Sequence, residues 1–184
     1  MGEPTEEQVR IALSRVRPGL TKYLWLQRQV RLCDVTANEE FQRTFCSFYR
    51  VRRDSQWQSK YFALLESSKL GGIDFPRALQ EINLRCGKIE ASFASKLVAT
   101  LDPSKPVIDK FVLNYFGLQL PRWGSPDREA RTIELYFELS EKYRALMQSS
   151  TGTLIRNLFD ASYPKVEVNE LKKIDFVLWQ LGRN

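Results

Sequence analysis

The feature that most constrains the fold is the spacing of the apolar residues, which recur every three or four positions along most of the chain. This spacing places them on one face of a helix. No stretch shows the sustained alternation of apolar and polar residues that a strand requires, and no internal repeat is visible. The sequence therefore predicts an all-α, compact, multi-helix globule. In residues 5–16 the stripe consists of Val9, Ala12, Leu13 and Val16.

Capping motifs indicate where several helices begin. Residues 5–8 and 36–39 both follow the capping-box pattern, with threonine first and Gln or Glu three positions later. Residues 125–127 (Ser-Pro-Asp) combine a capping hydroxyl, a proline and an acid. Pro18-Gly19 is expected to end the first helix. The predicted helices span residues 5–16, 20–34, 38–51, 54–68, 75–85, 91–101, 109–117, 126–148, 153–162 and 169–181.

The length of 184 residues fits one domain with a self-sufficient core, residues 1–184. Apolar residues make up 43% and charged residues 27%, which is ordinary for a globular protein and argues against disorder. A glycine pair at 71–72 separates two possible sub-lobes, 1–72 and 73–184.

The net charge of +6 makes a polyanion the default partner class, because clustered Lys and Arg gain affinity by releasing counterions from phosphates. An ordinary basic surface without such a partner is an equal alternative at this point. No apolar run approaches the roughly 20 residues of a membrane-spanning helix, and the acidic N-terminus lacks the layout of a signal peptide. We therefore expect a cytoplasmic protein without a membrane partner.

The chain has no histidine, and its three cysteines are widely scattered. These facts argue against a zinc site and remove the Ser-His-Asp and Cys-His triads. We expect no metal and no cofactor. Any catalysis would have to rest on carboxylates, lysine, tyrosine or a bound cofactor.

Residues 92–118 combine a helix of small residues, a proline-containing loop, and an aspartate that opens an apolar helix. This segment resembles the core of the HhH-GPD DNA glycosylase superfamily. In that family a hairpin of two helices is followed by an apolar helix, a loop ending in proline and aspartate, and another helix. Here residues 106–109 (Pro-Val-Ile-Asp) match the proline–aspartate stretch, and Val112, Phe116 and Leu118 match the helix after it.

The resemblance implies that Asp109 is the catalytic carboxylate, which stabilises the developing oxocarbenium sugar or orients the attacking water. The position of the catalytic lysine in bifunctional members falls, by its spacing from the aspartate, near Ser92. Serine there is similar to the monofunctional adenine glycosylases, although Lys88 or Lys96 could take the position after a shift in alignment. The alternative for Asp109 is a purely structural role, because aspartate is a favoured N-cap.

The hairpin of the family normally reads Leu-Pro-Gly-x-Gly, whereas residues 84–88 read Leu-Arg-Cys-Gly-Lys. Glycines in such a hairpin let backbone amides approach a DNA phosphate, so their loss weakens the case for this mode of binding. The side chains nearest the matched segment that could contact phosphates are Lys88, Lys96, Lys105 and Lys110.

Residues 48–60 interleave basic and aromatic residues. Arg50, Arg52 and Arg53 could clamp phosphates, and Trp57 could stack on a base. The equal alternative is a core aromatic helix with a solvated arginine face.

Two further segments carry tryptophan. Trp123 lies in a loop between prolines beside Arg122 and is a second candidate for base stacking; the favoured alternative is a loop anchor buried against the following helix. In the C-terminal helix we expect residues 172–173 (Lys-Lys) at the surface, and Phe176 and Trp179 in the core.

Two functions fit these patterns. The first is a DNA-interacting protein resembling a monofunctional base-excision glycosylase, either active or with the chemistry lost. The alternative is a helical protein–protein interaction module without a nucleic-acid role. The oligomeric state is left open by the sequence.

Overall fold

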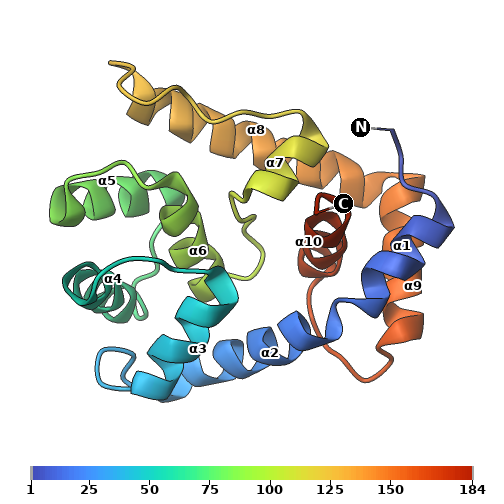
Figure 1. Ribbon diagram of the computed structural model, residues 1–184, viewed down its shortest axis with the longest axis horizontal. Helices are drawn as coiled ribbons and strands as arrows, with labels where there is room; N and C mark the ends of the chain where they lie inside the picture. Colours follow the sequence, from blue (N-terminus) through green and yellow to red (C-terminus); the bar gives the residue numbers. More distant parts are fainter. Residues whose placement is uncertain (1, 184) are drawn as a thin grey trace. The chain divides into compact units, whose positions relative to one another are not determined.

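Ten α-helices make up the regular structure of residues 2–183, which are the residues that the computed structural model describes (Figure 1). No strand occurs in that range, so the predicted all-α class is confirmed. The helices are α1 (Glu6–Ser14), α2 (Arg17–Leu32), α3 (Glu39–Tyr49), α4 (Ser55–Ser67), α5 (Phe75–Cys86), α6 (Ala91–Leu101), α7 (Lys110–Phe116), α8 (Arg128–Gln148), α9 (Ser150–Ser162) and α10 (Glu170–Leu181).

The chain divides into two compact units. The terminal unit consists of Met1–Arg17 and Pro103–Asn184, and the central unit of Pro18–Asp102. The boundaries between the units therefore follow Arg17 and Asp102, and do not fall at the glycine pair where the sequence suggested sub-lobes 1–72 and 73–184.

The predicted capping box at the start of α1 is confirmed. The side chain of Thr5 accepts a hydrogen bond from the backbone N–H of Gln8, and the Gln8 side chain accepts one from the backbone N–H of Thr5 at 2.9 Å. The box expected at residues 36–39 is wrong. Asn38 caps α3 instead, while Thr36 donates to Asp34 in a turn before the helix.

Two other predicted boundaries shift for reasons of backbone chemistry. Pro18-Gly19 was expected to end the first helix, but it lies in the first turn of α2. Proline is tolerated there because the first-turn N–H groups have no partner within the helix. Ser125 was expected to cap the eighth helix, yet that helix begins at Arg128 with Asp127 as an N-cap that makes no side-chain hydrogen bond.

Aromatic rings fill the core of the central unit. Phe45 of α3 lies at the middle of this cluster, with its ring centroid 5.5 Å from that of Phe62 and 5.6 Å from that of Tyr61. Phe41 packs on Phe45 and Phe62 in turn. These residues are buried, as the helical spacing of the aromatics in α3 and α4 indicated.

Helix α10 is the centre of the terminal unit, where it packs against α1, α7, α8 and α9 (Figure 1). Most of its residues are buried, including Phe176, and Trp179 is partly buried, as expected. Its end lies so close to α7 that a Cβ added at Gly182 would meet the Cβ of Phe111 at 2.7 Å. Only a glycine fits this contact.

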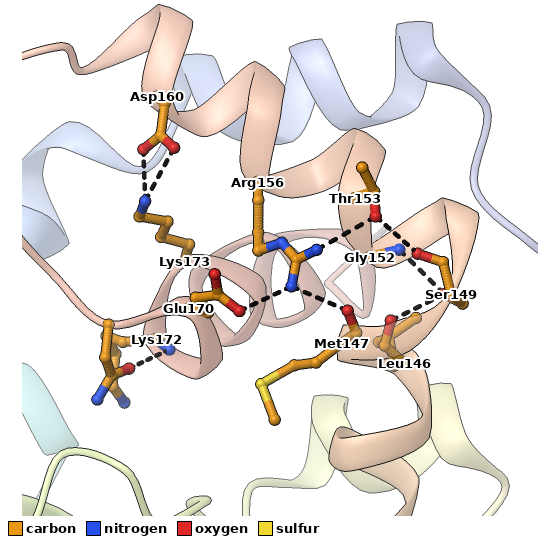
Figure 2. Close-up of polar contacts among 11 residues, drawn as sticks. Leu146, Met147, Ser149, Gly152, Thr153, Arg156, Asp160, Glu170, Lys172 and Lys173 are labelled. Carbon is orange, nitrogen blue, oxygen red and sulfur yellow. Dashed lines mark hydrogen bonds and ion pairs between the residues drawn. The ribbon is translucent and has the colours of Figure 1, made fainter.

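A tight corner joins α8 to α9, and Figure 2 shows its polar contacts. Ser149 ends α8 and also caps α9, because its hydroxyl donates to the carbonyl of Leu146 and accepts from the N–H of Gly152. The guanidinium of Arg156 donates both to the carbonyl of Met147 and to Glu170 of α10, each at 2.8 Å. The corner between α8 and α9 is therefore linked to α10 by this hydrogen bond and ion pair.

We expect Gly152→Ala to lower the free energy of unfolding by about 1–3 kcal/mol or more, as overpacking does. A Cβ at this position would lie 2.0 Å from the carbonyl oxygen of Leu146, and backbone cannot move aside as a flexible side chain could. Urea denaturation measures the change. Gly71→Ala is the control, because its Cβ would meet nothing within 4 Å, and it should shift the free energy by less than about 1 kcal/mol. Equal effects of the two substitutions would contradict this account of the corner.

Candidate nucleic-acid interface and carboxylate cluster

Helices α5 and α6 pack against each other as a hairpin within the central unit. Gly87 ends α5 in the left-handed conformation, with φ of 70°, and the space around it is open. The turn that follows is short, because α6 begins at Ala91. Lys88 is exposed in this turn, and Ser92 is partly buried in the first turn of α6.

The arginine-rich loop after α3 lies beside this hairpin. The guanidinium of Arg53 forms an ion pair with Glu90 at 2.5 Å, and the ammonium of Lys60 donates to the carbonyl of Arg85 at 2.8 Å. Arg52 and Lys88 are exposed, and among the described residues no ion pair or side-chain hydrogen bond involves either of them. The structure therefore brings two predicted phosphate ligands, whose charges are not neutralised locally, onto neighbouring segments. Arg50 ends α3 nearby with a positive φ of 54°.

The aromatic side chains of the same region belong to the core. Trp57 is 9% exposed, stacked on Tyr61 with centroids 5.0 Å apart and in contact with Phe93 of α6. Its indole Nε1 is buried and has no hydrogen-bond partner among the described residues. Because its faces are occupied, Trp57 cannot stack on a base in this conformation. Residues 48–60 thus match the second alternative, a core aromatic with an exposed arginine face, and phosphate contact by these arginines stays a prediction.

Lys96 differs from the other predicted phosphate ligands because it is 8% exposed. Its ammonium donates to the carbonyl of Tyr49 at 3.2 Å and lies 5.0 Å from the ring centroid of Phe93. A lysine held this way ties α6 to the end of α3. Its burial does not suit direct contact with a phosphate.

In the terminal unit, Asp109 is the N-cap of α7. Its carboxylate accepts a hydrogen bond from the backbone N–H of Phe111 at 2.9 Å, so the structural role that the sequence allowed is present. The side chain is only partly buried. Lys110, the first residue of α7, and Lys105 in the preceding loop are both exposed.

A buried polar group lies near this carboxylate. The hydroxyl of Tyr143 donates to Asp175 at 2.7 Å, and the ammonium of Lys172 pairs with the other oxygen of Asp175 at 2.8 Å. Burial raises the pKa of Tyr143 well above its usual value, with further contributions from the charge and hydrogen bond of Asp175 and from the charge of Asp109. We call Asp109, Tyr143, Lys172 and Asp175 the carboxylate cluster.

The expected surface position of Lys172 is wrong, because this residue is only 2% exposed. The sequence did hold a signal for it. Lys172 lies four residues before Phe176 and seven before Trp179, which were expected in the core, so it shares their face of the helix, where a lysine needs a partner. Asp175 lies three residues further along the helix and is that partner.

Trp123 is 70% exposed, so the favoured alternative, a buried loop anchor, is also wrong. One face of its ring is covered by the guanidinium of Arg128, 4.2 Å from the ring centroid. The predicted site residues therefore fall into two groups. Asp109, Lys105, Lys110 and Trp123 belong to the terminal unit; Ser92, Lys88, Lys96, Arg50, Arg52, Arg53 and Trp57 belong to the central unit.

The carboxylate cluster places an ion pair, Lys172 and Asp175, among buried apolar side chains. A buried ion pair is costly to form, and clusters with strongly perturbed ionisation occur often at functional sites as well as in structural networks. Asp109 is partly exposed, and its charge contributes to the raised pKa of the buried Tyr143. Within residues 2–183 the structure places no group of three or more Cys, Asp or Glu side chains where a metal ion could bind.

We expect Lys172→Met to lower the free energy of unfolding by about 3–5 kcal/mol, because it leaves the Asp175 carboxylate in the core without its counter-charge. Lys173→Met is the matched control. Lys173 pairs with Asp160 at 2.6 Å (Figure 2). The Asp160 side chain is 53% exposed and that of Lys173 is 16% exposed, so water can solvate the carboxylate when its partner is lost, and we expect a loss of about 1 kcal/mol. Urea denaturation of both variants gives the comparison. A similar fall in the free energy of unfolding in both variants would show that the buried Lys172–Asp175 pair matters no more to stability than the Lys173–Asp160 pair.

We expect the free energy of unfolding to fall as pH rises above about 10. The unfolded chain loses the Tyr143 proton near the ordinary pKa, whereas the folded protein retains it, so the unfolded state binds fewer protons there. Tyr143→Phe should make this alkaline decline shallower. Tyr61, whose pKa burial raises in the same way, accounts for part of the remaining decline. Urea denaturation across this pH range tests the point, and an unchanged slope in Tyr143→Phe would refute it.

Comparison with known proteins adds no relative. No protein-family model, no curated protein and no solved structure matches this chain. In the part of the chain that the structure describes, no helix is both long and apolar enough to cross a membrane.

Proposed function

We propose that this chain is a DNA-interacting protein of the HhH-GPD type, related to the monofunctional base-excision glycosylases. The observation that carries the proposal is the order of elements from α5 to α7. A hairpin of two helices is followed by a loop containing Pro106, and Asp109 then stands at the start of the next helix. The family order has the same hairpin, loop, aspartate and following helix, and α6, the second helix of the hairpin, stands where that order has its apolar helix.

The central unit supplies the groups for the phosphate backbone. It has 13 Lys and Arg against nine Asp and Glu, a net charge of +4. Arg52 and Lys88 lie on adjacent segments and form no ion pair with the described residues, and Arg53, next to Arg52 in sequence, pairs with Glu90. Unpaired cations gain most from displacing the counterions of DNA, so these side chains support binding that is independent of sequence.

Asp109 supplies the chemical group. In the proposed reaction the base leaves an extruded nucleotide, and a carboxylate stabilises the positive charge that develops on the sugar or orients the attacking water. Ser92 stands where bifunctional members carry a lysine, so hydrolysis by water without a Schiff base is the expected course. A descendant that keeps the fold and binds DNA without chemistry fits the same residues.

The proposal is tested by titrating a fluorescent duplex with an abasic-site analogue against the undamaged duplex, at several salt concentrations. We expect tighter binding to the abasic duplex, with affinity falling as salt rises. A screen for release of damaged bases follows, in which Asp109→Asn should reduce release on the order of a hundredfold or more. Asparagine is also a good N-cap, so α7 should remain intact.

Asp74→Asn is the matched control, because Asp74 caps α5 with the same kind of hydrogen bond. It should leave base release unchanged. Binding without release in any substrate would identify the inactive descendant. Failure of the wild-type protein to bind either duplex at low salt would refute the DNA role and favour the protein–protein interaction module.

A further inference from the structure

We infer that Trp123 is a stacking platform for an unpaired nucleobase, and that Arg122 contacts the adjacent phosphate. The inference rests on the proposed nucleic-acid function and assigns a specific ligand group to a loop of the terminal unit. The exposure of Trp123 is unusual. Its side chain keeps most of its surface in water, although an indole is among the side chains that gain most from burial.

The ring is held in place. The guanidinium of Arg128 lies over one face of the ring, 4.2 Å from its centroid, and this cation–π contact favours the observed position of the indole. The loop itself is constrained by Pro121 and Pro126, and the backbone N–H of Ser125 donates to the carbonyl of Arg122. A rigid platform loses little entropy when a ligand stacks on it.

Space and charge beside the ring suit a nucleotide. Gly124 has a φ of 82°, and a Cβ built there would meet nothing within 4 Å, so the approach next to the indole is open. Arg122 is exposed, and none of the described residues forms an ion pair or side-chain hydrogen bond with it. With one face of the indole occupied by Arg128, a single flat face remains for a planar group.

A nucleobase fits better than the apolar surface of a protein partner. Protein hot spots lie in an apolar centre surrounded by further contacts. The immediate neighbours of Trp123 along the chain are instead Arg122 and Gly124, and the one other large exposed apolar side chain of this loop is Leu120, which is 39% exposed. Stacking on an aromatic face with a cation nearby is how proteins hold unpaired bases regardless of sequence.

The test compares binding of two strands of equal length and charge, oligothymidylate and a strand of abasic units. The affinity is measured by fluorescence anisotropy of labelled strands, together with quenching of tryptophan fluorescence. We expect the wild-type protein to bind oligothymidylate about fivefold or more tightly than the abasic strand. Trp123→Ala should abolish this difference without changing affinity for the abasic strand, and Trp123→Phe should retain part of it.

Phe137→Ala is the control, since Phe137 is a second exposed aromatic of the same unit, 55% exposed on α8. It should leave the base preference unchanged. Equal affinity of the wild-type protein for both strands, with salt dependence retained, would overturn the stacking platform but not the DNA role. Trp123 would then be better explained as a contact for a protein partner. Base preference that persists in Trp123→Ala would also overturn it. Failure to bind either strand at low salt, with the duplexes of the previous test still bound, would overturn the platform alone, whereas failure to bind the duplexes as well would overturn both proposals.

Discussion

The terminal unit depends on the burial of most of α10. Four other helices pack against it, so a charged group on its buried side needs a partner inside the core. Lys172 and Asp175, one turn apart, supply that partner to each other, and Tyr143 of α8 supplies the remaining hydrogen bond. The same requirement brings charge close to the start of α7. A core held only by apolar contacts would give Asp109 no polar surroundings of this kind.

The sequence predicted the presence of the helices well, but it predicted some helix boundaries and the burial of some single residues poorly. Amphipathic spacing is a property of many residues, so one irregular position does not hide it; α3 and α4 followed it closely. Boundaries depend on single hydrogen bonds, and for this reason Asn38 rather than Thr36 caps α3. Lys172 and Trp123 departed from expectation in opposite directions, because average burial describes a residue type and not the packing around one position.

The candidate interface shows why net charge alone does not locate a binding surface. Arg10 and Arg43 are as exposed as Arg52, but each is neutralised by a glutamate one turn away on its own helix. A cation that already has a partner releases fewer counterions on meeting a phosphate than one whose charge is unmatched. A cation paired within its own helix can be recognised from the sequence by the spacing of the two residues. A cation without a partner is recognised only when the fold shows that no acid from another segment pairs with it.

On the proposed function, phosphate contact and base contact fall to different residues. Contacts to phosphates provide affinity and register without reading the base, whereas discrimination requires groups that touch the base or the sugar. Arg52 and Lys88 in the central unit are of the first type; Asp109 and Trp123 in the terminal unit are of the second. This division explains how a hairpin without the usual glycines could still serve. Lysine and arginine side chains, in place of backbone amides, would hold the phosphates. The role proposed for Asp109 would be the same in either case.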